Sequence, residues 1–287
     1  MKRLIIHADD LGADAARNAG IFEAMEAGVV TAASILANGP AFKDCLQRIV
    51  SGDFPGVSFG VHLNLTEGRP LSPPLNSITG PDGCFLGKPE AHRRLMHRGD
   101  EALEAEIRRE FTAQITVLRD AGIRIDHLDG HQHSHIFPAA LVSAVRVASE
   151  FRIPWFRIPE EAPSVESMAR SHPMLIDEAR IFCQLAAAAR TTIDGSALRT
   201  TDHFRGLYLK GTLSLETLEA TLEALPPGLT ELMVHPGRAT GGQVEGPFSA
   251  FSHRDRETEL EVLTSDRFRR MLEKYHVALT SFPEAGS

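Results

Sequence analysis

The sequence has few cysteines, and this scarcity excludes two common kinds of site. Its 287 residues include only three, Cys45, Cys84 and Cys183, which lie far apart. An odd number of widely spaced cysteines supports neither a disulfide framework nor a zinc site built from Cys-x-x-Cys pairs. A reducing compartment fits this usage, and we predict a cytoplasmic protein.

The sequence also lacks a long apolar run and an excess of basic residues. No stretch approaches the ~18–20 apolar residues that a bilayer-spanning helix requires, and we expect no secretory signal. The 30 Lys and Arg are outnumbered by 38 Asp and Glu, which gives a net charge of −8. A nucleic-acid partner, whose backbone attracts basic surfaces, is therefore not expected.

Apolar residues are plentiful, and their periodicity predicts alternating strands and helices. The hydrophobic fraction is 43%, which is enough for a large buried core. The pattern predicts strands at 3–8, 31–36, 57–64, 123–129, 155–158, 198–204, 230–235 and 276–282. It predicts helices at 17–27, 40–50, 101–120, 138–150, around 177–190, 214–224 and 255–274.

The order of these elements predicts the fold. About eight β-then-α alternations, without an internal repeat or a linker, predict one α/β domain over residues 1–287. An irregular, TIM-like (β/α) barrel is the simplest closure, and a doubly wound open sheet is the alternative. Segment 65–98 is rich in Gly and Pro. Because so long a loop inside a compact domain is usually functional, we expect it to cover the site.

Metal-type ligands occur at the ends of four expected strands. Asp9 and Asp10 follow the first strand, His62 lies in the third, His131 follows the fourth and His235 ends the seventh. Parallel strands deliver their carboxyl ends to one face of an α/β sheet. We therefore expect these side chains to meet there.

Asp9 and Asp10 are adjacent carboxylates that cannot point the same way in a regular strand. One can bind a cation while the other faces a water molecule beside it. Alternatively, one caps the turn at 11–12 and the other is solvated. Taken alone, His62 is better explained as a histidine of the core or of a turn, and His235 as a turn histidine. Both gain weight as site residues from the company of the other strand ends.

Segment 126–135 is the richest in candidate ligands. In extended or helical backbone, two of its three later histidines can share a face, and the sequence does not say which two: His131, His133 or His135. Three residues just upstream can orient a ligand imidazole through its second nitrogen: Asp126, His127 and Asp129. A solvated histidine-rich loop is the alternative, which the apolar strand before it disfavours.

One aspartate and two histidines, with open positions for water and substrate, form a facial site that suits zinc. Iron, cobalt and nickel are alternatives, and a more oxygen-rich version admits magnesium. The remaining aspartate and histidine then flank the metal as an acid–base pair. This set fits hydrolysis of an acyl bond, in which a carboxylate takes a proton from water and an imidazolium gives one to the leaving amine.

In order and spacing, these motifs resemble the YdjC-like carbohydrate deacetylase family, which contains chito-oligosaccharide and hopanoid-pathway deacetylases. The matching pieces span nearly the whole chain: His-Ala-Asp-Asp-Leu-Gly at 7–12, then 20–24, 28–32, 60–63, 127–135, 201–206 and 231–237. The resemblance implies an irregular barrel and one divalent metal ion per chain, zinc with magnesium as the alternative. It also implies removal of an N-acetyl group from an amino sugar in an oligosaccharide or a glycolipid.

The resemblance also implies roles for individual residues. The positions that match the metal ligands are Asp10, His62 and His131. Asp9 matches the base, and His235 matches the acid. Arg157, at the end of the fifth expected strand, would hold either the base or the substrate. The family usually has Asn where this chain has His7, and this imidazole can compete as a ligand or only pack. Segment 159–200 matches no motif, and we expect it to shape the sugar pocket.

Three other functions can use the same residues. An O-acetyl esterase would use the same site, whereas a non-catalytic sugar- or metal-binding barrel would bind without turnover. The pair of Asp9 and His235 argues against the second. Proton abstraction on a sugar phosphate would need a phosphate-binding turn, for which 237–242 is a weak candidate. The oligomeric state is open, with a homodimer as one alternative.

Overall fold

The computed structural model describes residues 1–52, 54–97, 100–162, 173–239, 248 and 253–286. The strands are β1 (Lys2–Leu11), β2 (Ala32–Ile35), β3 (Ser58–Leu63), β4 (His127–Gly130), β5 (Trp155–Phe156), β6 (His203–Arg205), β7 (Gly228–Val234) and β8 (Val277–Leu279). The helices are α1 (Ala15–Glu26), α2 (Phe42–Ser51), α3 (Lys88–Leu95), α4 (Glu101–Asp120), η1 (His131–Ile136), α5 (Pro138–Glu150), α7 (Pro173–Asp194), α8 (Leu215–Ala224), α9 (His253–Thr264), α10 (Asp266–Lys274) and α11 (Phe282–Ala285). None of the helices in these ranges combines the length and the hydrophobicity needed to traverse a bilayer.

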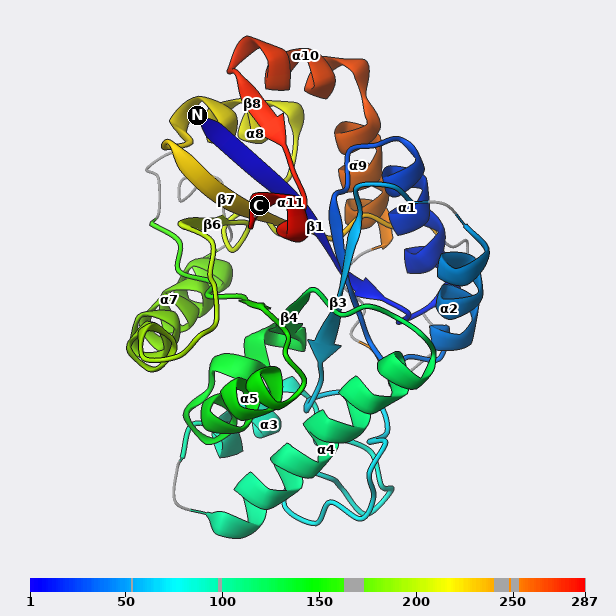
Figure 1. Ribbon diagram of the computed structural model, residues 1–287, viewed down its shortest axis with the longest axis vertical. Helices are drawn as coiled ribbons and strands as arrows, with labels where there is room; N and C mark the ends of the chain where they lie inside the picture. Colours follow the sequence, from blue (N-terminus) through cyan, green and yellow to red (C-terminus); the bar gives the residue numbers. More distant parts are fainter. Residues whose placement is uncertain (53, 98–99, 163–172, 240–247, 249–252, 287) are drawn as a thin grey trace.

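One parallel sheet organises the domain, and the helices surround it (Figure 1). Its strands are ordered β5-β4-β3-β2-β1-β7-β6, and β8 pairs with the start of β1. The end strands β5 and β6 have two and three residues. In the described part of the chain, an isolated bridge between Trp155 and Arg199 links β5 to the residues before β6.

The sheet therefore curls into a half-barrel. The predicted α/β, barrel-like single domain is confirmed in this form, but the full closure that we expected is not found. The physical reason is the length of the end strands, because two or three residues offer too few backbone groups for a continuous ladder between them.

Helix α4 follows its apolar spacing closely. The side chain of Asp100 accepts the backbone N–H of Leu103 at 3.0 Å, as an N-cap does. The apolar stripe at helical spacing is buried in the core: Leu103, Ile107, Phe111, Ile115 and Leu118. Burial of this stripe fixes the helix against the outside of the sheet.

Two buried glutamates of α4 hold segment 65–98. Glu110 accepts the backbone N–H groups of residues 71 and 72 at 2.9 and 2.8 Å. Glu106 accepts those of residues 76 and 77, both at 2.8 Å. The segment also contains α3, which the sequence did not predict and which begins after Gly87 with a proline in its first turn. The hydrogen bonds to α4 thus fix the path of segment 65–98 over the domain.

Strand β1 lies inside the sheet and brings two carboxylates to its carboxyl end. It pairs with β7 and with β2, and the β2 register shifts between Ala8 and Leu11. Within this irregularity Asp10 has a φ of 69°, a left-handed conformation that is uncommon outside glycine. Regular strand residues alternate between faces, so this bulge allows both Asp9 and Asp10 to line one pocket. The first strand thus extends beyond its expected end at residue 8.

Candidate metal centre and active site

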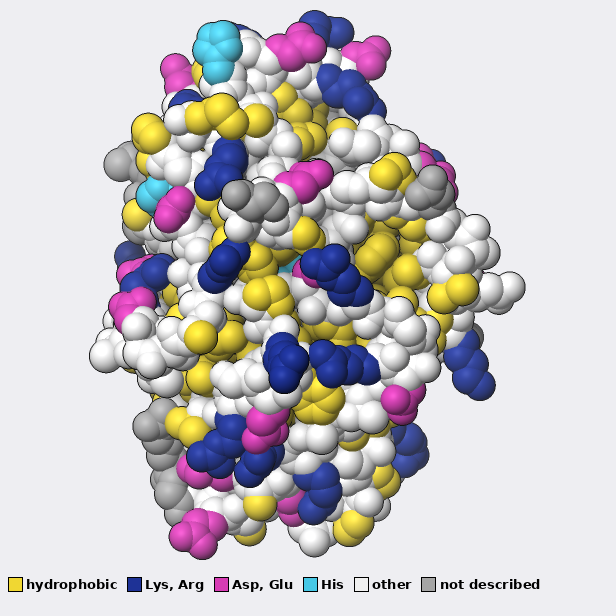
Figure 2. All heavy atoms as spheres, in the orientation of Figure 1, with side chains coloured by type: hydrophobic (Ala, Val, Ile, Leu, Met, Phe, Trp, Pro, Cys, Tyr) yellow, Lys and Arg dark blue, Asp and Glu magenta, His cyan; other side chains and the backbone are white. Residues whose placement is uncertain are grey.

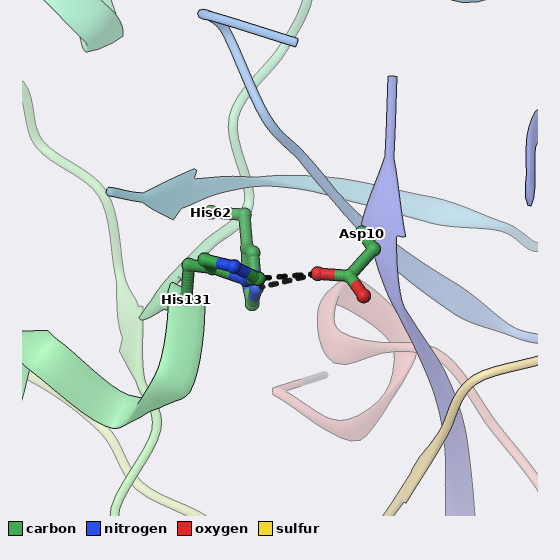
Figure 3. A group of neighbouring side chains, drawn as sticks. All are labelled: Asp10, His62 and His131. Carbon is green, nitrogen blue, oxygen red and sulfur yellow. Dashed lines mark ion pairs between the residues drawn. The ribbon is translucent and has the colours of Figure 1, made fainter. Parts of the chain in front are cut away.

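Three ligand-type side chains meet at the carboxyl ends of three strands of the parallel sheet (Figure 3). Asp10 comes from β1 and His62 from β3, while His131 begins η1 directly after β4. Asp10 Oδ1 lies 2.9 Å from His131 Nδ1 and 3.5 Å from His62 Nε2. All three side chains are buried and line the same pocket.

A second buried group orients each of the two imidazoles. Asp129 Oδ1 lies 2.8 Å from His62 Nδ1, and Ser34 Oγ lies 3.0 Å from the same nitrogen. Glu67 Oε2 lies 2.9 Å from His131 Nε2. Partners of this kind fix the orientation of a ligand ring and leave its other nitrogen for a metal.

Asp10 is held in its anionic form, which is the form that can bind a cation. Burial tends to raise the pKa of Asp10, but His131 and Arg256 hold it well below its usual range. Arg256 Nη2 donates to Asp10 Oδ2 at 2.7 Å, so Oδ1 is the oxygen that faces the imidazoles. Burial tends to lower the pKa of His62, but Asp129 and Asp10 raise it to about 10. A divalent ion would replace the proton that His62 carries at neutral pH.

The donor set fits a divalent metal ion. A tetrahedral zinc site with bonds of about 2.0–2.1 Å separates neighbouring ligand atoms by roughly 3.3 Å. The two distances from Asp10 Oδ1 are 2.9 and 3.5 Å, on either side of that value. Two other close groups of ligand-type residues occur in the described part of the chain. One is His7, Asp129 and Glu231, and the other is Asp9, His62 and Asp129. The carboxylates of both groups already pair with the guanidinium of Arg157.

Asp9 is held by Arg157, which follows β5. Arg157 donates to both carboxylate oxygens of Asp9 at 2.7 Å, and its Nε donates to Glu231 Oε1 on β7 at 2.7 Å. Burial tends to lower the pKa of Arg157, but Asp129, Asp9 and Glu231 raise it well above its usual range. Asp9 lines the pocket, whereas the guanidinium of Arg157 is buried behind it. Of the two roles predicted for Arg157, these contacts fit that of holding the base.

His235 follows β7 and lines the same pocket. Its backbone N–H donates to Glu259 Oε2 on α9 at 2.6 Å, which fixes the turn after the strand. Burial and the nearby charge of Arg256 lower the pKa of His235 to about 3. The imidazole is therefore neutral near pH 7 before substrate binds.

The structure separates the histidines of segment 126–135. His131 joins the group around Asp10, whereas His135 Nε2 lies 3.0 Å from a backbone carbonyl oxygen. His133 packs edge-on against an aromatic ring of α7, with centroids 4.6 Å apart. Asp126, a further candidate for a supporting role, pairs instead with a neighbouring arginine at 2.8 Å.

His7 lies outside the group of Asp10, His62 and His131 and contacts three buried carboxylates. Its Nδ1 lies 2.7 Å from Glu231 Oε1, and its Nε2 lies 3.4 Å from Asp129 Oδ2 and 3.9 Å from Asp9 Oδ1. These three carboxylates also surround the guanidinium of Arg157. The imidazole of His7 therefore belongs to the buried network behind Asp9.

Residues from two segments without an assigned motif line the pocket. Lys88 on α3 and Glu178 on α7 form an ion pair, and Lys88 Nζ lies 6.0 Å from the ring centroid of Phe182. The pocket is also lined by four further residues: Leu175, Ala179, Leu207 and Lys210. Segment 65–98 and the described part of 159–200 thus both reach the pocket, while residues 163–172 lie outside the described residues.

Several contacts of the site were not predicted from the sequence. Arg256 and Lys88 lie in helices, so the strand-end pattern does not mark them. Glu67 lies three residues beyond the third expected strand, in the segment that we expected to cover the site. Glu231 did carry a signal, because the period of two along a strand places it on the same face as His235.

The strand-end carboxylates and imidazoles of the half-barrel define a barrel-like α/β protein with a candidate metal centre. The chain belongs to the family of YdjC-like proteins, whose family model matches residues 3–274. The family predicted from the motifs is thereby confirmed.

Two relatives that align with this chain over nearly their whole length are both named carbohydrate deacetylase. A carbohydrate deacetylase of Mus musculus is 34% identical over 305 residues, which cover 99% of this chain and 95% of the relative. A carbohydrate deacetylase of Brevibacillus brevis is 27% identical over 285 residues, which cover 99% and 100%. A crystal structure of an Enterococcus faecalis V583 protein, provisionally assigned to cellobiose-phosphate cleavage, superposes with a TM-score of 0.74 at 25% identity and covers 98% of both chains.

Proposed function

We propose that this protein is a metal-dependent carbohydrate deacetylase that removes an N-acetyl group from an amino sugar. One observation carries the proposal: the Asp10, His62 and His131 group lines the same pocket as Asp9 and His235. A cation site, a carboxylate and an imidazole are the groups that metal-assisted amide hydrolysis uses. The name shared by the relatives supports a carbohydrate substrate.

The residues of the pocket divide the chemistry among them. A divalent ion held by Asp10, His62 and His131 would polarise the acyl carbonyl and acidify a water molecule. Asp9 accepts the proton of the attacking water, and Arg157 keeps both of its oxygens in place at 2.7 Å. General-base catalysis depends on this fixed position.

His235 is proposed as the group that protonates the leaving nitrogen. Since burial and Arg256 lower its pKa to about 3, it has to gain its proton during the reaction. Negative charge that develops on the acyl oxygen raises the pKa of a neighbouring imidazole. The proton that Asp9 takes from the attacking water can then pass through His235 to the departing nitrogen, so no external proton is needed.

Zinc is the metal that we propose, with magnesium as the alternative and one ion per chain. Two imidazoles and one carboxylate form a nitrogen-rich set, which zinc prefers to the all-oxygen sets of magnesium. In the other two close groups of ligand-type residues, the carboxylates already pair with the guanidinium of Arg157. Arg157 contacts both oxygens of Asp9, whereas Arg256 contacts only Oδ2 of Asp10 and leaves Oδ1 toward the imidazoles.

The compartment and the macromolecular partners are proposed from composition. Cys45, Cys84 and Cys183 are free thiols, which supports the cytoplasm. Figure 2 shows acidic and basic side chains interspersed with apolar surface on one face. The net charge of −8 for the whole chain does not favour a nucleic-acid partner.

Acetate release tests the proposal. Purified protein with zinc should release acetate from short N-acetylglucosamine oligomers or from an N-acetylglucosaminyl lipid, and prior chelation should stop it. Returned zinc should restore the rate. Release that withstands chelation would refute the metal dependence, and metal binding without turnover would indicate a sugar-binding protein. A faster reaction with O-acetyl than with N-acetyl substrates would indicate an esterase.

The pair of Lys88 and Glu178 offers a test of where the sugar binds. We propose that these side chains bind sugar hydroxyl groups, because both line the pocket and neither belongs to the metal centre. Glu178→Gln and Lys88→Met should each raise KM about tenfold and change kcat less than threefold, since a hydrogen bond to a charged group contributes about 1.5–3 kcal/mol.

The control for these variants is Lys274→Gln, which breaks an exposed ion pair between Lys274 of α10 and Glu219 of α8. Its KM should equal that of the unmodified protein. Equal KM values for all three variants would show that the sugar does not bind to Lys88 or Glu178.

A further inference from the structure

Asp129 joins the two halves of the candidate site. It lies on β4 directly opposite His62 in the β3–β4 register, and its side chain is fully buried. Asp129 Oδ1 lies 2.8 Å from His62 Nδ1, whereas Oδ2 lies 2.9 Å from Arg157 Nη2. The same Nη2 lies 2.7 Å from Asp9 Oδ1. One carboxylate thus contacts both a candidate metal ligand and the group that holds the candidate base.

We propose that Asp129 is a positioning residue that sets the spacing between the metal ion and the base. This inference rests on the proposed function and goes beyond it. His62 and Arg157 each have other buried partners, namely Ser34, Asp9 and Glu231. Those partners hold each side chain separately, but within the described residues Asp129 is the side chain that contacts both.

The chemistry of the partners explains why a carboxylate is needed. Arg157 donates only, because a guanidinium has no acceptor. His62 must donate from Nδ1 if its Nε2 is to present a lone pair to the metal. Asp129 therefore has to accept on both sides. A carboxylate has two acceptor oxygens, whereas an asparagine amide has one oxygen and an NH₂ group that only donates.

Asp129→Asn should disturb both halves at once. An amide that accepts from Arg157 turns its NH₂ toward His62, which favours the tautomer that cannot bind metal through Nε2. We expect zinc affinity, measured by competition with a chromogenic chelator, to fall 10–100-fold. With saturating zinc, kcat should remain at least tenfold low, because Asp9 is no longer held at its distance from the ion. KM should change less than threefold, since Asp129 does not line the pocket.

The matched control is Asp126→Asn, the same chemical change three positions earlier on the same segment. Its partner is Arg124, at 2.8 Å, so zinc affinity and kcat should stay at the unmodified values. Should Asp129→Asn fail to fold by circular dichroism, Asp129→Glu keeps both acceptors on a side chain one methylene longer. It should retain zinc within fivefold and lose at least tenfold in kcat.

The outcomes separate the two proposals. If the unmodified protein neither binds zinc nor releases acetate, the proposed function fails. If it does both, and Asp129→Asn behaves like Asp126→Asn, the positioning role alone is refuted. If zinc at saturation fully restores kcat of Asp129→Asn, the carboxylate orients His62 without fixing the base, and the coupling that we propose is wrong.

Discussion

Asp10→Asn should reduce acetate release by at least about a thousandfold, because Lewis-acid stabilisation by a bound ion supplies several kcal/mol. Asp10 Oδ1 is the atom that lies near both His131 Nδ1 and His62 Nε2. An amide in its place loses the negative charge that attracts the ion. Arg256 donates to Asp10 Oδ2 at 2.7 Å. In the variant, its positive charge would repel the metal ion without a carboxylate charge to offset it. Zinc content by mass spectrometry should fall together with activity.

A matched control for Asp10→Asn is Asp120→Asn, at the exposed end of α4. This variant removes one carboxylate from the chain without touching the pocket, so it should keep full zinc content and full activity. Melting temperatures of both variants identify any loss that comes from unfolding. An active, zinc-loaded Asp10→Asn protein would disprove the assignment of Asp10 as a ligand.

Asp9→Asn should lower kcat by about 10²–10⁴-fold, the range that a positioned general base contributes. Zinc affinity should stay within about threefold of the unmodified value, because Asp9 lies outside the group of Asp10, His62 and His131. An amide keeps the size of the side chain but cannot take a proton from water. Excess zinc should therefore not restore the rate, in contrast to the recovery expected after chelation.

The comparison of the two aspartate variants is the sharpest test of how the adjacent pair is divided. If Asp9→Asn loses zinc as completely as Asp10→Asn, both carboxylates bind the ion and a different residue must serve as the base. If Asp9→Asn keeps its activity, Asp9 has a structural role with Arg157. The steady-state parameters and the metal content, measured on the same preparations, separate these results.

Much of the fold follows from local patterns. The stripe of α4 and its cap at Asp100 are encoded within twenty consecutive residues, so the helix could be predicted with its ends. Closure of the barrel could not, because it depends on how much ladder β5 and β6 can form. The sequence predicts strands at 155–158 and 198–204, whereas β5 and β6 have two and three residues. Helix α3 was missed for a related reason, since its turn-rich surroundings obscure its start.

The site could be predicted as a set but not as an arrangement. Strand ends converge in a parallel sheet, and this rule predicts that residues 9–10, 62 and 131–135 lie near one another. It does not say which aspartate or which histidines form the group with His62. The bulge that turns Asp10, with its φ of 69°, arises where β2 loses register with β1. Arg256 reaches Asp10 from α9, on the opposite end of the chain, and no spacing rule links the two.

The pairing of β1 has a consequence for biosynthesis. Residues 2 to 8 of β1 form their ladder with residues 228 to 234 of β7, and residues 2 to 4 also pair with β8. A nascent polypeptide emerges from the ribosome with its apolar first strand exposed on one edge until nearly the last segments have been made. Contacts between such distant segments slow folding, and an unpaired edge invites association with other chains. A prematurely terminated product would therefore lack the partner of its own first strand and would be prone to aggregate.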